Sequence, residues 1–166
     1  MSRILRGCAT FLVVGVVAAA IGCKQNKEPE MAKSAEGGSL YSRLGGHDAI
    51  VKVVDNFVAK AAADKDVNFT RTNPMHPNHW DPSADDNMAR FKAHLVQFIE
   101  MATGGPQKYE GRSMEEAHKG MEITDAEFTA LAKDLKDTLV EMGVPDKEQG
   151  GLMAVVGSTH DSIVGK

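Results

Sequence analysis

The sequence is poor in aromatic side chains and cysteine, and it carries no excess of positive charge. Aromatic residues make up 5% of the 166 residues, and one of them is tryptophan. Two cysteines cannot build a disulfide framework, and no CxxC pair is present to serve zinc or redox chemistry. A formal net charge of −4 argues against a nucleic-acid-binding protein. With 42% hydrophobic and 25% charged residues, wholesale disorder and a multi-span membrane protein are also excluded.

One long hydrophobic run is present, and it lies at the N-terminus. Two arginines precede an uncharged stretch from Gly7 to Cys23, which is typical of a signal peptide and marginal for a spanning helix of about 20 apolar residues. Its end, Ala20 to Cys23, resembles the bacterial lipobox, although Ala20 stands where leucine is usual. We therefore expect residues 1–22 to be a lipoprotein-type signal peptide and Cys23 to be lipidated. An ordinary signal peptide and an uncleaved anchor are the alternatives.

The rest of the chain divides into a tether and one domain. Residues 23–38 are polar and contain Pro29 and a pair of glycines, which is typical of a flexible linker. Residues 39–166 form the expected globular domain. A lipid on Cys23 would hold this domain at a membrane of the cell envelope, facing the periplasm.

Apolar residues recur at spacings of three and four along most of the domain, which predicts amphipathic helices. No segment alternates as a strand would, so the predicted fold class is all-α. Ser113 and Thr124 each precede a glutamate by three residues, and these two capping boxes predict helix starts. The four apolar stripes run over residues 50–61, 91–102, 128–142 and 152–163.

Residues 64–87 break this periodicity. The segment has three prolines and is long for a connection within one domain, so it is expected to be a functional or mobile loop. It contains His76, His79 and Trp80. A polar loop is favoured over a metal site there, because no third ligand follows at a fixed spacing.

Three of the six histidines lie where chemistry is plausible, namely His94, His118 and His160. No HxxxH pair is present, and no acidic or thiol partner completes a zinc or di-iron set. A single histidine on each of two separate helices suits a large flat group between them. A porphyrin is such a group, because its iron takes a neutral imidazole and its disc needs an apolar slot.

Four motifs carry a resemblance to a known family: SLYSRLGG at 39–46, NMARFKAH at 87–94, ATGGPQKYEGR at 102–112 and MEEAHKGMEIT at 114–124. Residues 39–165 resemble the group I truncated haemoglobins. The resemblance implies a two-over-two helical sandwich around a non-covalent haem b, iron protoporphyrin IX. The CxxCH signal of c-type attachment is absent.

The resemblance also implies roles for individual residues. His118 matches the proximal iron ligand, and its alternative interpretation is a surface histidine stabilised by a helix C-terminus. Tyr109 and Met114 lie in the same motifs. The residues expected to contact the haem are Phe57, Val58, Phe69, Phe91, Leu95, Phe98, Tyr109 and Met114.

The distal side departs from the family pattern. Val58 stands where many members have tyrosine, and Leu95 stands where glutamine is common. Hydrogen bonds to a charged group are worth about 1.5–3 kcal/mol, so the absence of donors predicts faster oxygen release and easier autoxidation. His94 matches a histidine that binds the iron in some cyanobacterial members, which makes it a candidate sixth ligand. A bond from His94 to a haem propionate or to solvent is the alternative.

His160 is a weaker candidate. It lies about one residue out of register with a histidine that bonds a haem vinyl group in those same cyanobacterial members. A helical histidine near the surface is therefore favoured over a covalent haem link.

Three functions follow, from different classes. The favoured one is a tethered globin that reversibly binds oxygen, NO or CO. It is expected to be a binding protein rather than an enzyme, with an NO-dioxygenase-type side activity as the alternative. The second is a bis-histidine haem protein for electron transfer or NO detoxification, which would need an unidentified reductase. The third is a haem-free helical interaction module, which would not need His118.

Overall fold

The computed structural model describes residues 38–70 and 86–166. The expected signal peptide, the tether up to residue 37, Cys23, His76, His79 and Trp80 lie outside these described residues. In the described parts no helix has both the length and the apolar character needed to cross a membrane. The helices found there are α1 (Leu40–Arg43), α2 (Gly46–Ala63), α3 (Asn87–Ala102), α4 (Met114–His118), α5 (Asp125–Glu141), α6 (Asp146–Gly157) and α7 (His160–Ile163).

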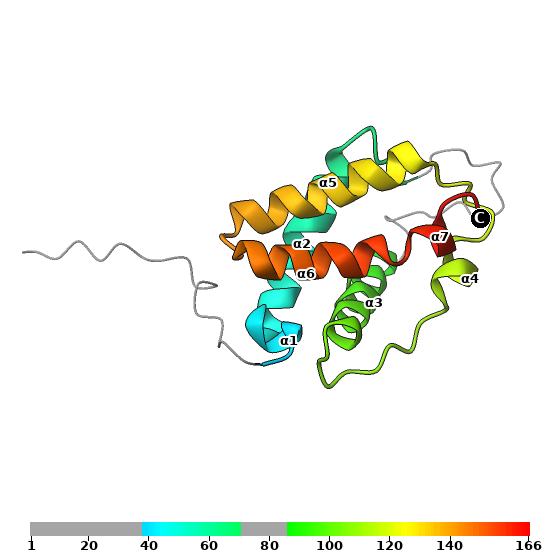
Figure 1. The fold of residues 1–166 in the computed structure, drawn as a ribbon. Helices are drawn as coiled ribbons and strands as arrows, with labels where there is room; N and C mark the ends of the chain where they lie inside the picture. The colour runs from blue at the N-terminus through cyan, green and yellow to red at the C-terminus, as the bar shows by residue number, and fades with distance from the viewer. Residues whose placement is uncertain (1–37, 71–85) are drawn as a thin grey trace, which may run out of the picture.

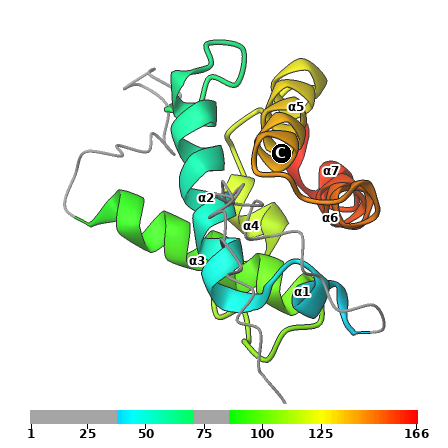
Figure 2. The ribbon, with the colours of Figure 1, turned by 90° about the vertical axis from the view of Figure 1, so that its left-hand side faces the viewer.

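The four long helices form two pairs. Helices α2 and α3 pack together, α5 and α6 pack together, and α2 also packs on α5 and so joins the pairs. Figure 1 shows α5 and α6 running side by side, and Figure 2 shows them to one side of α2 and α3. This is a two-over-two helical sandwich, with α1 packed against α2 and α6.

The core lies where the pairs meet, and the apolar stripes of the sequence form it. Every buried residue of α2 belongs to the predicted stripe: Ile50, Val53, Val54, Phe57, Val58 and Ala61. Leu139 of α5 and Leu152 of α6 are 0% and 1% exposed. No strand occurs among residues 38–70 and 86–166, where an isolated bridge joins Ile123 to Val164, so the predicted all-α class is confirmed.

The fourth predicted stripe, residues 152–163, is not one helix. Helix α6 ends at Gly157, and α7 begins at His160. Between them the Ser158 hydroxyl donates to the carbonyl of Val155 at 2.6 Å, and the Thr159 hydroxyl donates to that of Val156 at 2.7 Å. Such local side-chain bonds compete with the helical hydrogen-bond pattern, which explains the break.

Both predicted capping boxes are present. The Ser113 hydroxyl accepts from the Glu116 amide at 3.2 Å, and the Glu116 carboxylate accepts from the Ser113 amide at 3.2 Å. Thr124 and Glu127 make the same reciprocal pair at the start of α5. These caps satisfy amides that the first helical turn leaves unpaired, and they fix where α4 and α5 begin.

Helix α4 is held in place by contacts with other segments, because none of its own residues is buried. It has five residues, none of them buried, and it packs against α7. The segment that follows it pairs with the end of the chain. The Glu122 amide donates to the carbonyl of Lys166 at 2.9 Å, and the Gly165 amide donates to that of Ile123 at 2.9 Å. The C-terminal residues therefore anchor the chain immediately after α4.

Candidate functional site

His118, the last residue of α4, is half-buried, and one of its ring nitrogens has a defined partner. Its Nδ1 lies 2.7 Å from the main-chain carbonyl oxygen of Met114, one helical turn earlier. A carbonyl oxygen can only accept, so Nδ1 must carry the proton. In a neutral imidazole the lone pair is then on Nε2, which is the form of histidine that coordinates a metal, with its other nitrogen bonded to an acceptor.

The local sequence explains this geometry. The Ser113 capping box fixes the first turn of α4, so the carbonyl of Met114 lies one turn below His118. Helix α4 then ends, and Gly120 follows in a left-handed conformation with φ of 76°. Glycine adopts such a conformation at little cost, which allows the chain to turn away directly after the histidine.

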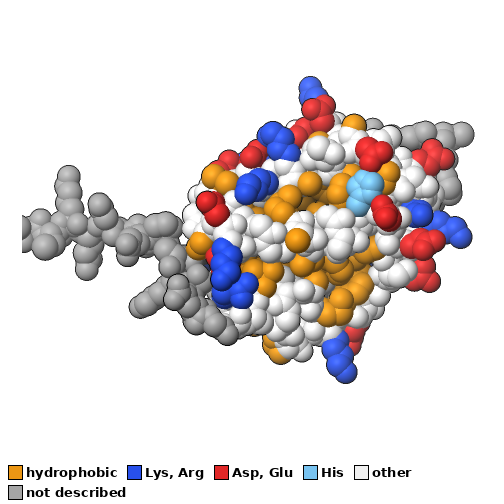
Figure 3. All heavy atoms as spheres, viewed as in Figure 1, with side chains coloured by type: hydrophobic (Ala, Val, Ile, Leu, Met, Phe, Trp, Pro, Cys, Tyr) orange, Lys and Arg blue, Asp and Glu red, His pale blue; other side chains and the backbone are white. Residues whose placement is uncertain are grey.

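Helix α3 carries three of the predicted contact residues on one face. Phe91, Leu95 and Phe98 are spaced by four and three residues and are half-buried, in contact with the core. The ring of Phe69 meets that of Phe91 edge-to-face, with 5.5 Å between the centroids. The protein thus leaves an apolar row on α3 incompletely covered. Figure 3 shows hydrophobic side chains gathered around α6 and between α6 and α3, with charged side chains mostly toward the edge.

Tyr109 connects this row to α4. Its ring lies edge-to-face on Phe98 and on His94, with centroid distances of 5.8 and 6.2 Å. Its hydroxyl donates to the carbonyl of Arg112 at 2.9 Å, just before α4. Burial raises the pKa of the Tyr109 hydroxyl, and the positive charge of Arg112 lowers it in part. A Cβ atom at Gly111 would lie 2.3 Å from that hydroxyl oxygen, so a side chain there would force the Tyr109 ring to shift.

The other residues predicted to contact the haem or its iron differ in burial. His94 is exposed on α3 and contacts Tyr109, while Met114 is half-buried and supplies the carbonyl for His118. Phe57 and Val58 lie deep in the core, at 8% and 2% exposure. Their contacts with a haem, and iron ligation by His94, stay predictions.

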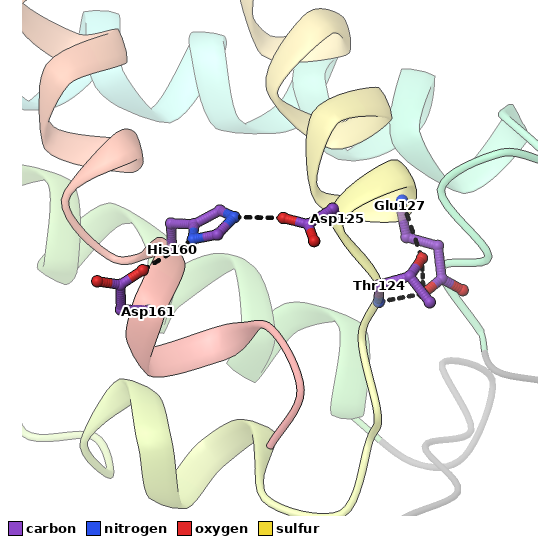
Figure 4. A network of polar contacts seen from close by, with 5 residues as sticks. All are labelled: Thr124, Asp125, Glu127, His160 and Asp161. Atoms are coloured by element: carbon purple, nitrogen blue, oxygen red, sulfur yellow. Dashed lines mark hydrogen bonds and ion pairs between the residues drawn. The ribbon is translucent and has the colours of Figure 1, made fainter.

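His160 is the first residue of α7, and its ring contacts two acidic residues (Figure 4). Its Nε2 is 2.8 Å from an Asp125 oxygen, and its Nδ1 is 3.0 Å from an Asp161 oxygen. Both hydrogen bonds raise the pKa of the imidazole above its ordinary value of 6.5. The bond to Asp161 has the larger effect, and the bond to Asp125 the next. The ring also stands edge-to-face on Phe128, at 5.0 Å. His160 therefore joins α7 to the first turn of α5, as a surface histidine would.

Sequence reasoning missed the partners of two histidines. His47 contacts Glu100 across 53 residues, at 2.7 Å between Nδ1 and a carboxylate oxygen, and His160 meets Asp125 across 35 residues. No spacing rule in the sequence indicates such pairs, because they depend on how separate helices cross. The charged residue at 100 within an apolar stripe was the one available signal.

Comparisons with known proteins agree with this geometry. A family model described as "Bacterial-like globin" matches residues 39–164. The group 1 truncated haemoglobin of Mycolicibacterium paratuberculosis is 34% identical over 126 residues, which cover 75% of this chain and 82% of that protein. The corresponding protein of Synechocystis is 36% identical over 124 residues, covering 72% and 90%.

The chain belongs to the group 1 truncated haemoglobins. Solved structures show the same fold for this globin. The truncated haemoglobin of Tetrahymena pyriformis in its Fe(III) form superposes with a TM-score of 0.65 at 31% identity, over 78% of this chain and all of that one. The 2/2 haemoglobin of Synechococcus, solved in the cyanomet state with covalently attached haem, superposes with a TM-score of 0.62 at 31% identity, with the same coverage.

Membership of the globin family implies haem binding, and the described residues of this globin fit that cofactor. The bond from Nδ1 to the Met114 carbonyl gives neutral His118 the tautomer of a metal ligand. The half-buried apolar row of α3 suits the face of a porphyrin, which is itself apolar and flat. Among residues 38–70 and 86–166 no cluster of three or more His, Cys, Asp or Glu side chains could hold a free metal ion instead.

Proposed function

We propose that this globin binds haem b through His118 and reversibly binds a small diatomic gas. The observation that carries the proposal is the hydrogen bond from His118 Nδ1 to the Met114 carbonyl oxygen, because it leaves the lone pair on Nε2. When bound, the haem iron supplies the coordination position for a gas such as oxygen, NO or CO. The residues of this chain would hold the haem and line the space beside it.

The apolar row of α3 supports the proposal through its position and its coverage. Phe91, Leu95 and Phe98 keep part of their surface uncovered by protein, although burying it would stabilise the fold by about 25 cal/mol per Å². A flat apolar cofactor would cover that surface. Side chains of this kind would also exclude water from the distal side.

The distal residues favour short retention of a bound gas. Neither Val58 nor Leu95 has a side-chain hydrogen-bond donor. A charged or strongly polar ligand would therefore lose a bond worth about 1.5–3 kcal/mol compared with a pocket that carries tyrosine or glutamine. This supports rapid binding and release over long-term oxygen storage.

A second function has one specific observation in its favour. His94 lies on α3, four residues before Phe98, and its ring contacts Tyr109. Because the ring of Tyr109 also contacts Phe98, the imidazole of His94 lies beside the same apolar row. Iron ligation by both His94 and His118 would suit electron transfer, with a separate reductase as the electron donor.

The cellular setting of the globin is proposed from the sequence. The uncharged run from Gly7 to Cys23 and its lipobox-like end support a lipid on Cys23. The polar segment that follows would tether the globin to a membrane of the cell envelope, facing the periplasm. Mass spectrometry of the protein purified from bacterial membranes tests this, with Cys23→Ser as the variant that should be released.

Visible spectroscopy tests the haem proposal and separates the two functions. The full-length chain is loaded with haemin, reduced with dithionite and titrated with CO, alongside His94→Ala and the surface control His160→Ala. Low-spin ferrous bands that disappear in His94→Ala would favour the bis-histidine protein. A five-coordinate ferrous spectrum, unchanged in both variants and converted by CO, supports the open gas-binding globin. Failure to form a stable haem complex would contradict both functions.

A further inference from the structure

The chain leaves His118 through a hydrogen-bonded turn. The Met121 amide donates to the carbonyl of His118 at 2.9 Å. Lys119 has φ of −56° and ψ of 125°, and Gly120 has φ of 76°, which are the values of a type II turn. The bond fixes the two ends of this turn relative to each other. The position of Met121 therefore bears directly on the position of His118.

The residue after this turn, Glu122, has an unusual backbone. Its φ is 50°, a left-handed conformation that side chains other than those of asparagine and aspartate rarely adopt. Within the described residues the other non-glycine example is Asn68, which belongs to the tolerant types. Such a backbone persists only where surrounding contacts hold it, and it is typical of segments that serve a ligand site.

The contacts that hold Glu122 come from residues 163–166, which we call the C-terminal clasp. The Glu122 amide donates to the carbonyl of Lys166, and the Gly165 amide donates to the carbonyl of Ile123, both at 2.9 Å. An isolated parallel bridge also joins Ile123 to Val164. The clasp therefore binds two consecutive residues of the segment that follows α4 through main-chain atoms.

The clasp is itself fixed to the body of the globin. Ile163 is 8% exposed, and the Val164 amide donates to the carbonyl of His160 at 2.9 Å. The ring of His160 lies 2.8 Å from an Asp125 oxygen at the start of α5 and stands on the ring of Phe128, which is 7% exposed. Helix α7 also packs against α4. The clasp is thus a fixed point from which the segment after His118 can be held.

Helix α4 needs such a fixed point. The Ser113 capping box holds its first turn, but none of its five residues is buried, so packing does not fix the end that carries His118. A histidine that ligates a metal is oriented by the partners around it, and a small displacement changes the strength of the bond. The capping box acts on one side of the histidine, and the clasp acts on the other.

We propose that the C-terminal clasp positions His118 for ligation of the haem iron. It acts through the backbone of Glu122 and the type II turn, and its residues are positioning residues because they act through His118. The inference rests on the proposed ligation of the iron by His118. It adds that the strength of that bond depends on main-chain contacts made more than forty residues later in the sequence.

A chain that ends at Val164 tests this role, because it lacks both main-chain hydrogen bonds of the clasp. Lys166→Ala is the matched control, since it keeps the carbonyl that accepts from Glu122. In the haemin-loaded proteins, exchange of the Ala117 and Met121 amides should be about five- to a hundred-fold faster in the shortened chain. Its iron–histidine stretching band, recorded by resonance Raman after photolysis of the ferrous CO complex, should shift or broaden. Lys166→Ala should match wild type in both measurements.

A second pair of variants breaks the same contact from the other side, so that the test does not depend on the folding of the shortened chain. Glu122→Pro removes the amide donor and excludes a φ of 50°, whereas Glu122→Ala removes the side chain alone. The proline variant should reproduce the shifted Raman band with the helical circular dichroism of wild type retained, and the alanine variant should match wild type.

The outcomes separate this inference from the proposed function. If wild type binds haem and both clasp-breaking variants keep its Raman band and amide exchange, the clasp has no positioning role and this inference alone is overturned. A lower unfolding temperature with an unchanged Raman band would identify a purely structural clasp and would also overturn it. Failure of wild type to bind haem would contradict the proposed function and this inference with it.

Discussion

Helices α3 and α4 carry the two sides of the proposed haem site, and they are held in opposite ways. Helix α3 has 16 residues and buries Val96, Ile99 and Glu100 against the rest of the globin. Helix α4 has five residues and buries none of them. Capping bonds fix its start, and the paired C-terminal segment holds the chain after its end.

This difference separates two requirements of a cofactor site. The wall that lines a flat cofactor benefits from a rigid helix, because its apolar side chains must keep their spacing. The residue that would ligate the iron benefits from a short element, whose position can adjust without moving the core. We expect damage to α3 to act on the stability of the whole globin, and damage to α4 to act locally.

The largest loss of stability is expected when a buried residue of α3 is truncated. Ile99 is 5% exposed, so Ile99→Ala removes buried apolar atoms and leaves a cavity, at a cost of about 2–5 kcal/mol in the free energy of unfolding. Met101 on the same helix is 45% exposed, and Met101→Ala should stay within about 0.5 kcal/mol of wild type. Urea unfolding followed by circular dichroism measures both. Equal effects would show that α3 is not held by packing.

A smaller effect is expected at the start of α4. Ser113→Ala removes a cap that is worth about 0.5–2 kcal/mol to its helix. Because α4 buries no residue, the loss should appear as faster amide hydrogen exchange in α4, with little change in global unfolding. Thr124→Ala removes the same kind of cap from the 17-residue α5 and is the matched comparison. If Ser113→Ala lowers global stability as Thr124→Ala does, α4 is part of the cooperative core.

The smallest effect concerns His160, which joins α7 to α5. Its pKa is raised in the folded state, so protonation favours folding. The contribution is fully present below the unfolded value of about 6.5 and is lost as the pH rises through the folded pKa. The unfolding temperature of His160→Gln should therefore differ more from wild type at about pH 5 than at about pH 9. A constant difference across this range would mean that the two carboxylates do not hold the imidazolium.

Much of this architecture could be predicted from local sequence. The stripe of α2 and the two capping boxes are properties of residues three and four apart, and each appears in the structure where it was predicted. The break between α6 and α7 could not be predicted from apolar spacing, because the distinctive contacts there are hydrogen bonds from the polar Ser158 and Thr159 hydroxyls.

Contacts between residues far apart in the sequence could not be predicted from local patterns. The pairing of His47 with Glu100 follows from the crossing of α2 and α3, which no periodicity specifies. His118 was found because its surrounding motif resembles a known family. Its bond to Met114, which sets the tautomer, required the structure.

We propose that His118 ligates the haem iron, and rescue by free imidazole is the sharpest test of that role. Haemin is titrated into wild type, His118→Gly and the surface control His160→Gly, and the visible spectra are recorded with and without added imidazole. We expect a defined haem spectrum in wild type and His160→Gly, its loss in His118→Gly, and its return when imidazole is added. A His118→Gly variant that binds haem with the affinity and spectrum of wild type, without imidazole, would contradict the claim.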